Sequence, residues 1–434
     1  MSDPTRTPAD SAPQKKNILR VAFLTLFLDL LGFGILIPIQ PYFAESFGAA
    51  PSVITLLSAS YSLMQFLFAP LWGALSDRFG RRPIVLLSIA CSAAGFLAFG
   101  FATSLWMLFL SRMIAGFGNA NLGTVQAIVA DVTSGKDRAK GMGMIGAAFG
   151  LGFIFGPVIG GVTGAAFGPQ APAFFSAGFA LINWLYAYKY LAETRVVSFS
   201  TVSSTIGSAN SQGTTTSPPA RGFSALRSFS RIRHLVNVPR LLFVAFVVAV
   251  GFSLMETSLS LFLEHRFLPL SSIGTKEGVK AATQLTMWVL LAVGVTAALV
   301  QGVLIGPLRK RWGEKTLLIA GGLCMSVSFV ACAFIGDIPN GYPWMFPAIV
   351  GIAFGSGIFS PSASSLISRS VDEDMQGEAL GLSQSVQALG RIAGPVMSGL
   401  LFELSAKMPF LVGAVFLAVG AGVCVRIVQP KDAA

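Results

Sequence analysis

Charged side chains are scarce in this sequence. Asp, Glu, Lys and Arg make up 11% of the 434 residues, whereas hydrophobic residues make up 53% and the mean hydropathy is +0.71. Soluble domains carry about 25% charged residues, so the composition excludes a soluble enzyme. It predicts an integral, multi-pass membrane protein.

Histidine and cysteine are also rare. The two histidines, His234 and His265, fall outside the predicted membrane spans, and the four cysteines fall inside them without a C-x-x-C spacing. We interpret the cysteines as packing residues and expect neither disulfides nor a metal site. Spans without histidine or clustered acids offer no catalytic set, so we expect no enzyme activity. Residues 1–19 are polar and lack the apolar core of a cleavable signal peptide.

Long apolar runs are abundant. A helix needs roughly 20 apolar residues to cross a bilayer, and we count twelve such runs. They cover residues 20–41, 53–73, 83–102, 105–127, 140–164, 172–191, 240–263, 285–306, 315–336, 343–367, 377–402 and 409–428. The predicted fold is therefore an all-α membrane protein with twelve transmembrane helices.

Between the sixth and seventh runs the composition changes. Residues 196–236 are rich in Ser, Thr, Gly and Asn and then become basic, which predicts a flexible linker. The expected organisation is a cytoplasmic tail (1–19), a six-helix half (20–195), this linker, a second six-helix half (237–428) and a short cytoplasmic tail (429–434).

The net charge of +11 has a topological explanation. With the amino terminus inside, the cytoplasmic segments hold 24 of the 30 Lys and Arg residues, the outer loops hold four and the spans hold two. This bias follows the positive-inside rule. It leaves no support for nucleic-acid binding.

The most informative motif is GALSDRFGRRP, from Gly73 to Pro83. It resembles the loop between helices 2 and 3 of the major facilitator superfamily, and with the preceding LMQFLFAPLW it looks most like the tetracycline-efflux branch of the drug/proton antiporters. The resemblance implies that Asp77 faces the amino-terminal end of the eleventh helix, near 376–379, as a gating latch, and that Arg81 or Arg82 pairs with Asp131. The expected gating residues are Gly73, Asp77, Arg78, Gly80, Arg81, Arg82 and Asp131.

The second half repeats the first weakly. Gly73, Leu75, Arg78 and Gly80 recur 233 positions later in GPLRKRWGEK as Gly306, Leu308, Arg311 and Gly313. Gly156-Pro157 recurs as Gly394-Pro395, 238 positions later. These matches indicate two pseudo-symmetric halves. The acid is not repeated, because Asp77 corresponds to Lys310.

The fifth run contains GPVIGG. Its spaced glycines allow a neighbouring helix to approach closely, and the segment resembles the element associated with antiporters of this superfamily. The residues concerned are Gly152, Gly156, Pro157, Gly160 and Gly161. Packing alone is the competing interpretation.

Ionisable residues inside the spans are the candidates for proton coupling and the substrate cavity: Asp29, Arg112, Glu256 and Arg391. An ionised side chain at the bilayer centre costs at least roughly 2.5–3.5 kcal/mol, so such residues usually serve a function. Asp29 resembles the first-helix acid of drug/proton antiporters and is our preferred proton carrier. Glu256 has Arg391 as a potential partner, and a permanent ion pair between them is the alternative.

The sequence therefore predicts a proton-coupled exporter of amphipathic drugs or small metabolites, without a cofactor and driven by the proton gradient. We expect a monomer in the bacterial inner membrane, with both termini cytoplasmic, that contacts lipid, protons and a small-molecule substrate. The predicted third and ninth helices lack the acids of the tetracycline-efflux pattern, so the substrate stays open. The alternatives are a facilitative or proton-coupled importer and, more remotely, a non-transporting membrane receptor or a membrane-embedded enzyme.

Overall fold

The structure is a computed structural model that describes residues 12–133, 135–194, 237–269, 271, 275–371 and 376–427. Within these ranges the regular secondary structure is entirely helical. The predicted linker, 196–236, lies outside the described residues.

The first set of helices comprises α1 (Ala12–Leu36), α2 (Gln40–Glu45), α3 (Pro51–Phe79), α4 (Arg81–Gly100), α5 (Leu105–Gly118), the 3-10 turn η2 (Asn119–Asn121), α6 (Leu122–Val132), α7 (Gly135–Phe167) and α8 (Ala171–Tyr190). The second set comprises α10 (Val238–Phe267), α11 (Lys276–Leu299), the π-helical turn η5 (Val300–Leu304), α12 (Ile305–Ile335), α13 (Tyr342–Arg369), α14 (Gln376–Leu404) and α15 (Met408–Val425).

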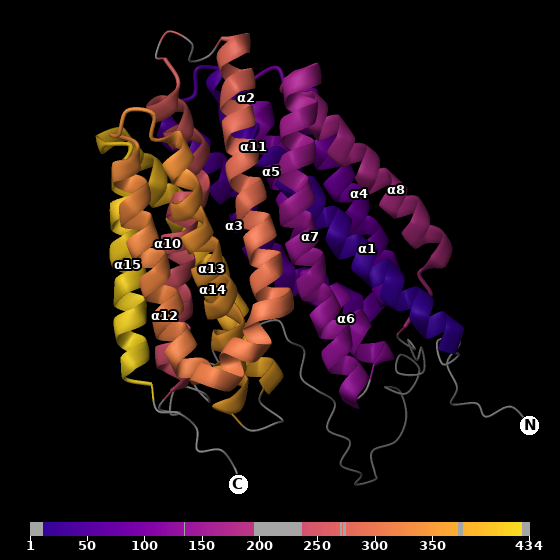
Figure 1. The fold of residues 1–434 in the computed structure, drawn as a ribbon. Coiled ribbons are helices and arrows are strands. Elements are labelled where there is room, and N and C mark those ends of the chain that lie inside the picture. Colours follow the sequence, from indigo (N-terminus) through magenta and orange to yellow (C-terminus); the bar gives the residue numbers. More distant parts are fainter. Residues whose placement is uncertain are drawn as a thin grey trace, which may run out of the picture.

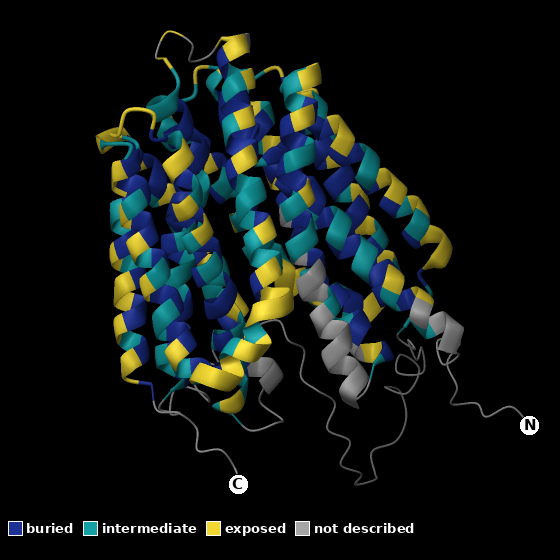
Figure 2. Ribbon diagram, in the orientation of Figure 1, coloured by how far each residue is buried: buried dark blue, intermediate teal, exposed yellow. Residues whose placement is uncertain are grey.

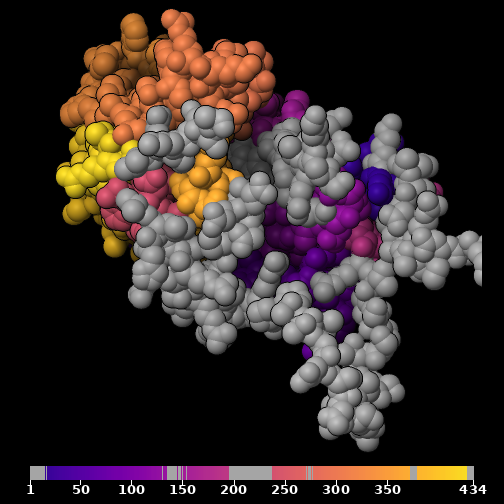
Figure 3. Space-filling model, turned by 90° about the horizontal axis from the view of Figure 1, so that it is seen from below, coloured from indigo at the N-terminus to yellow at the C-terminus, as the bar shows by residue number. Residues whose placement is uncertain are grey.

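The long helices run alongside one another as one bundle (Figure 1), and the two sets occupy opposite sides of it when it is seen from below (Figure 3). We call the lower end in Figure 1, where α6 lies, the inner end. The upper end, where α2 lies, is the outer end.

Equivalent helices pack in equivalent ways in the two sets. In the first, α1 packs on α7, and α4 packs on α5 and α8. In the second, α10 packs on α14, and α12 packs on α13 and α15. The two sets meet where α3 packs on α14 and α7 packs on α11. This pattern agrees with the weak repeat read from the sequence.

Burial follows the requirements of a lipid environment. Large apolar side chains such as Leu67, Val327, Val415 and Leu404 are exposed, and Figure 2 shows exposed positions distributed along the helices. Helices satisfy their own backbone hydrogen bonds, so they can present apolar side chains to lipid. Eight helical segments in the described ranges are long and apolar enough to cross a membrane, so the chain is a multi-pass integral membrane protein.

The helix bounds differ from the predicted runs at several points. The fourth run is broken at η2, and the eighth passes through η5 before α12 begins. The GPLRKRWGEK segment, predicted as the second-half counterpart of the first turn, lies within α12, although Gly313 has non-helical angles (φ 74°). Helix α10 continues to Phe267, so His265 and Arg266 lie in its last turn and not in a loop as predicted.

Candidate functional site

The junction between α3 and α4 depends on one glycine. Gly80 has φ of 99° and separates the two helices. An L-residue disfavours this conformation, and a Cβ atom built there would lie 2.5 Å from a Glu193 carboxylate oxygen. Gly80 therefore permits both the turn and the close approach of Glu193.

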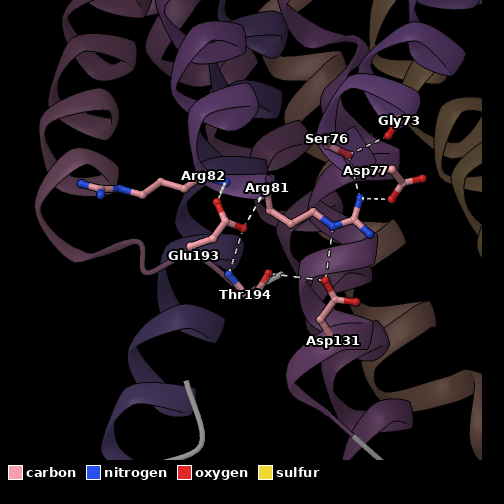
Figure 4. A network of polar contacts seen from close by, with 8 residues as sticks. All are labelled: Gly73, Ser76, Asp77, Arg81, Arg82, Asp131, Glu193 and Thr194. Carbon is pink, nitrogen blue, oxygen red and sulfur yellow. Dashed lines mark hydrogen bonds and ion pairs between the residues drawn. The ribbon is translucent and has the colours of Figure 1, made fainter. Parts of the chain in front are cut away.

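Arg81 is the centre of the inner-end polar network (Figure 4). Its side chain is buried; Nη1 lies 2.8 Å from Asp77 Oδ1 and Nε lies 3.2 Å from Asp131 Oδ2. Nη1 also donates to Ser76 Oγ at 2.7 Å. Arg81 is thus the partner of Asp131, which the sequence left open between two arginines.

Arg82 turns away from this network. Its Nη2 donates to the Tyr188 carbonyl oxygen at 2.7 Å, and its guanidinium lies 5.6 Å from the centre of the Tyr188 ring. Arg78 lies over the Phe79 ring, and a Cβ atom at Gly73 would meet no described atom within 4 Å. The Arg78 and Arg82 side chains do not join the Asp77–Arg81–Asp131 contacts, whereas the Gly73 carbonyl oxygen accepts the Ser76 hydroxyl (2.8 Å) that also binds Arg81 (Figure 4).

Glu193 completes the junction. Its two carboxylate oxygens accept the backbone N–H groups of Arg81 (2.8 Å) and Arg82 (3.1 Å). The first N–H groups of a helix lack intrahelical partners and favour an anion, so Glu193 caps α4 from the segment after α8. Sequence reasoning missed this residue, because nothing near position 193 signals its contact with position 81.

The predicted partner of Asp77 cannot be placed. The side chains of 376–378, at the start of α14, lie outside the part of the chain that the structure describes. The latch between Asp77 and this helix end stays a prediction.

Asp29 is buried in the interior of the first set of helices. Its Oδ2 accepts a hydrogen bond from Asn121 Nδ2 at 3.0 Å, and the same amide lies 2.8 Å from Ser88 Oγ. The contact joins α1 to η2 and α4. The 3-10 turn η2 thus brings Asn121 to the carboxylate, a residue that the sequence analysis did not single out.

Arg112 is buried on α5 without an acidic partner among the described contacts. Its guanidinium lies over the rings of Phe99 (4.8 Å) and Tyr61 (5.8 Å), and Nη1 donates to Gln40 Oε1 at 3.5 Å. Nε and Nη2 have no described hydrogen-bond partner. Cation–π contacts of this kind retain a desolvated charge without neutralising it.

Glu256 and Arg391 lie near the interface between the two sets. Glu256, on α10, is half-buried, and Arg391, on α14, is exposed. They interact electrostatically, but the described contacts contain no ion pair or hydrogen bond between them. The Tyr61 hydroxyl interacts electrostatically with three of the four candidate residues, Asp29, Arg112 and Arg391.

The glycines of the GPVIGG helix produce the contact between α1 and α7. A Cβ atom at Gly152 would lie 2.7 Å from Leu30 Cβ, and one at Gly156 would lie 2.7 Å from Gly34 Cα; a Cβ atom at Gly160 would overlap Ile35. Gly161 faces another direction and packs on Met287 of α11. The stripe therefore touches the helix that carries Asp29, and the adjacent glycine touches the second set.

Among the residues that the structure describes, the hydrogen bonds given between the two sets lie at the outer end. The Tyr42 hydroxyl lies 2.9 Å from Thr286 Oγ1 and donates to the Ser260 carbonyl oxygen at 3.1 Å. The Ser52 N–H donates to Glu403 Oε1 at 3.3 Å. At the inner end, the described polar contacts of Arg81 and of Glu314 stay within one set. The structure is thus held closed at the outer end.

The sequence is similar to that of known membrane transporters. A family model described as Major Facilitator Superfamily matches residues 22–395 and 267–434. The class C tetracycline resistance protein of Escherichia coli is 31% identical over 409 residues, which cover 92% of this chain and 94% of that protein. Multidrug resistance protein 2 of Bacillus subtilis (strain 168) is 28% identical over 424 residues, covering 97% and 98%.

A solved structure supports the same assignment. The human organic anion transporter MFSD10 (TETRAN) superposes with a TM-score of 0.66 at 25% identity, over 96% of this chain and 100% of that one. The paired helix packing, the Asp77–Arg81–Asp131 network and the family match all indicate the same family. The chain belongs to the Major Facilitator Superfamily, whose members are transporters and not enzymes.

Proposed function

We propose that this protein is a proton-coupled exporter of amphipathic drugs or small organic metabolites, which operates by alternating access in a bacterial cytoplasmic membrane. The proposed halves are residues 20–195 and 237–428, with twelve spans and both termini cytoplasmic. The tetracycline and multidrug resistance relatives, aligned over about nine-tenths of the chain or more, support export of drug-like compounds.

The observation that carries the proposal is the environment of Asp29. This buried carboxylate receives its described hydrogen bond from a neutral amide, Asn121, and has no described ion pair. A carboxyl group in such surroundings can exist in both protonation states, because no fixed cation holds it ionised. Glu256 differs, since Arg391 lies within electrostatic reach.

Arg112 provides the second element of the coupling. Its charge is held by Phe99, Tyr61 and Gln40 and not by an acid. Tyr61 interacts with both Arg112 and Asp29. We propose that the uncompensated Arg112 charge favours proton release from Asp29 when the cavity is open to the cytoplasm, where an exporter must discharge its proton.

The lining around these residues suits an amphipathic substrate. Tyr61 stacks on Phe33 with ring centres 5.1 Å apart, and its hydroxyl accepts from Asn119 Nδ2 at 3.1 Å and Gln65 Nε2 at 3.2 Å. Aromatic faces with a few convergent polar groups are typical of small-molecule sites. The proposed substrate therefore presents a flat apolar body and at least one polar group.

The test is proton release from inverted membrane vesicles on addition of a compound panel that includes tetracyclines and aromatic dyes. Asp29→Asn is expected to abolish uphill, gradient-driven accumulation while substrate exchange down its own gradient partly remains. Glu256→Gln is the matched control and is expected to retain pH-driven accumulation.

If Asp29→Asn keeps pH-driven accumulation and Glu256→Gln abolishes it, Glu256 is the proton carrier. If both variants keep full accumulation, these acids do not couple transport, and a facilitative carrier replaces the antiporter. Direction separates the importer alternative: an exporter accumulates substrate inside inverted vesicles, whereas an importer accumulates it in right-side-out vesicles.

A further inference from the structure

Three metal-ligand side chains meet at the outer end of the bundle. Glu45 is the last residue of α2, whereas Glu264 and His265 lie in the last turn of α10. One ligand atom from each lies within 4.8 Å of the other two. The group therefore combines one ligand from the first set of helices with two from the second.

The charge in this group is not balanced. Glu264 is completely buried, and the one described partner of its carboxyl group is the carboxyl group of Glu45, so no donor or cation of the described chain pairs with either. Burial of an unsatisfied carboxylate is strongly unfavourable. The nearby cations Arg266 and Lys407 are engaged by Asp337 instead. Two contacting carboxylates repel each other, so the pair needs either a shared proton or a cation to neutralise it.

His265 can offer a ring nitrogen to an ion. Its Nδ1 lies 2.9 Å from the Leu261 carbonyl oxygen, and its ring meets the Phe402 ring edge-on. Donation from Nδ1–H to a carbonyl leaves Nε2 with a free lone pair, the usual arrangement of a metal-binding histidine. This imidazole lone pair distinguishes the group from a simple acidic cluster.

The neighbouring contacts position the two ligand segments. Tyr42, three residues before Glu45, is bound through its hydroxyl to Ser260 on α10 and Thr286 on α11. Helix α2 is therefore already held against the helix that carries Glu264 and His265.

We propose that Glu45, Glu264 and His265 bind Zn²⁺ between the two halves of the bundle. One imidazole nitrogen and two carboxylate oxygens are ordinary Zn²⁺ ligands, and water can supply the fourth. The ion neutralises the two buried carboxylates. Because its ligands come from both halves, it binds only the outward-closed state and stabilises that state.

Binding is tested on the full-length chain in nanodiscs after treatment with a chelator, by calorimetric titration with ZnCl₂. We expect a single site. Glu264→Gln and His265→Gln are each expected to weaken it by more than about 100-fold, beyond the 10–100-fold typical of an outer-shell residue. Glu403→Gln is the matched control, since Glu403 is another outer-end acid that contacts Ser52 and not this group, and it should bind Zn²⁺ normally.

Undetectable Zn²⁺ binding to the wild type, or equal binding to all variants, overturns the site. A wild type that ignores Zn²⁺, with a Glu264→Gln variant that melts at higher temperature, also overturns it and indicates a proton shared by the two glutamates. His265→Gln keeps the test valid if the Glu264 variant does not fold, because His265 is only half-buried.

The effect on the conformational cycle is a separate measurement that rests on the proposed function. In proteoliposomes with Zn²⁺ at the outer face, substrate exchange is expected to slow in the wild type but not in His265→Gln. If Zn²⁺ binds but exchange does not slow, the proposed stabilisation of the outward-closed state is wrong, whereas the binding site itself is retained. Calorimetry does not require transport, so it remains decisive even if the export proposal fails.

Discussion

The two inner-end turns have the same backbone and opposite charges. Gly80 and Gly313, 233 positions apart, both adopt positive φ (99° and 74°). In the first turn a buried cation, Arg81, lies between Asp77 and Asp131. In the second a buried anion, Glu314, lies 3.7 Å from Arg309 and 3.5 Å from Arg369, and accepts from Ser365. Each half therefore neutralises one buried charge with two of opposite sign.

The sign of the buried charge affects the following helix. Glu314 stands at the start of the helical stretch after Gly313, where an acid is favoured by the free N–H groups. Arg81 stands at the corresponding start of α4, where a cation is disfavoured. The first turn compensates by recruiting Glu193 as a cap. The comparison shows that the positive-φ glycine fixes the backbone of each turn. The buried charge after it can be of either sign, provided that a cap such as Glu193 is present when the charge is a cation.

The largest expected effect separates the two buried charges. Arg81→Gln leaves Asp77 and Asp131 without their cation. Breaking a fully buried pair costs about 3–5 kcal/mol, and we expect about 2–3 kcal/mol here because both acids are about one-third exposed. Thermal unfolding in detergent measures the loss.

Glu314→Gln is the matched variant in the second turn. Arg309 and Arg369 are 57% and 46% exposed, so water can solvate them and the loss should stay below about 1 kcal/mol. A loss for Glu314→Gln that equals or exceeds the loss for Arg81→Gln would contradict the expected difference between the two networks.

The next effect concerns transport. Asp77→Asn is expected to slow transport about tenfold, equivalent to about 1.4 kcal/mol, because it removes a state-specific contact and no topology signal. Lys310→Gln, at the corresponding position of the second turn, should change the rate less than about twofold. Transport rates normalised to expression compare the two, and equal losses would refute the latch at Asp77.

The smallest effect tests the cap. Glu193→Gln should destabilise the protein by about 0.5–1 kcal/mol, since an amide still accepts one N–H but carries no charge for the helix start. Hydrogen exchange at the first N–H groups of α4 should accelerate, while exchange in the stretch after Gly313 stays unchanged. Unchanged exchange at both sites would mean that Glu193 does not act as a cap.

The sequence predicted the features that depend on local pattern. Apolar runs located most of the long helices, the GALSDRFGRRP motif pointed to a contact of Asp131 with Arg81 or Arg82, and glycine spacing pointed to a close helix approach at the fifth run, which the structure shows to be that of α1 and α7. These signals lie within a few neighbouring residues or in a recurrent motif, so they can be recognised without knowledge of the fold.

The remaining features depend on contacts between distant segments. Glu193 reaches the start of α4 from more than a hundred residues away, and Asn121 reaches Asp29 only because η2 interrupts the fourth run. Glu264 looked like the edge of a loop, because the apolar run ends one residue earlier and α10 continues beyond it. Periodicity cannot report such contacts, since they are set by how helices meet.

The glycine stripe on α7 has a mechanical consequence. Where backbone meets backbone, as at Gly156 and Gly34, there are no side chains that could change rotamer and absorb a displacement. We therefore expect helices α1 and α7 to shift together as one rigid body. A displacement of α1 at Asp29 would then reach Gly161, which packs on Met287 of the opposite half.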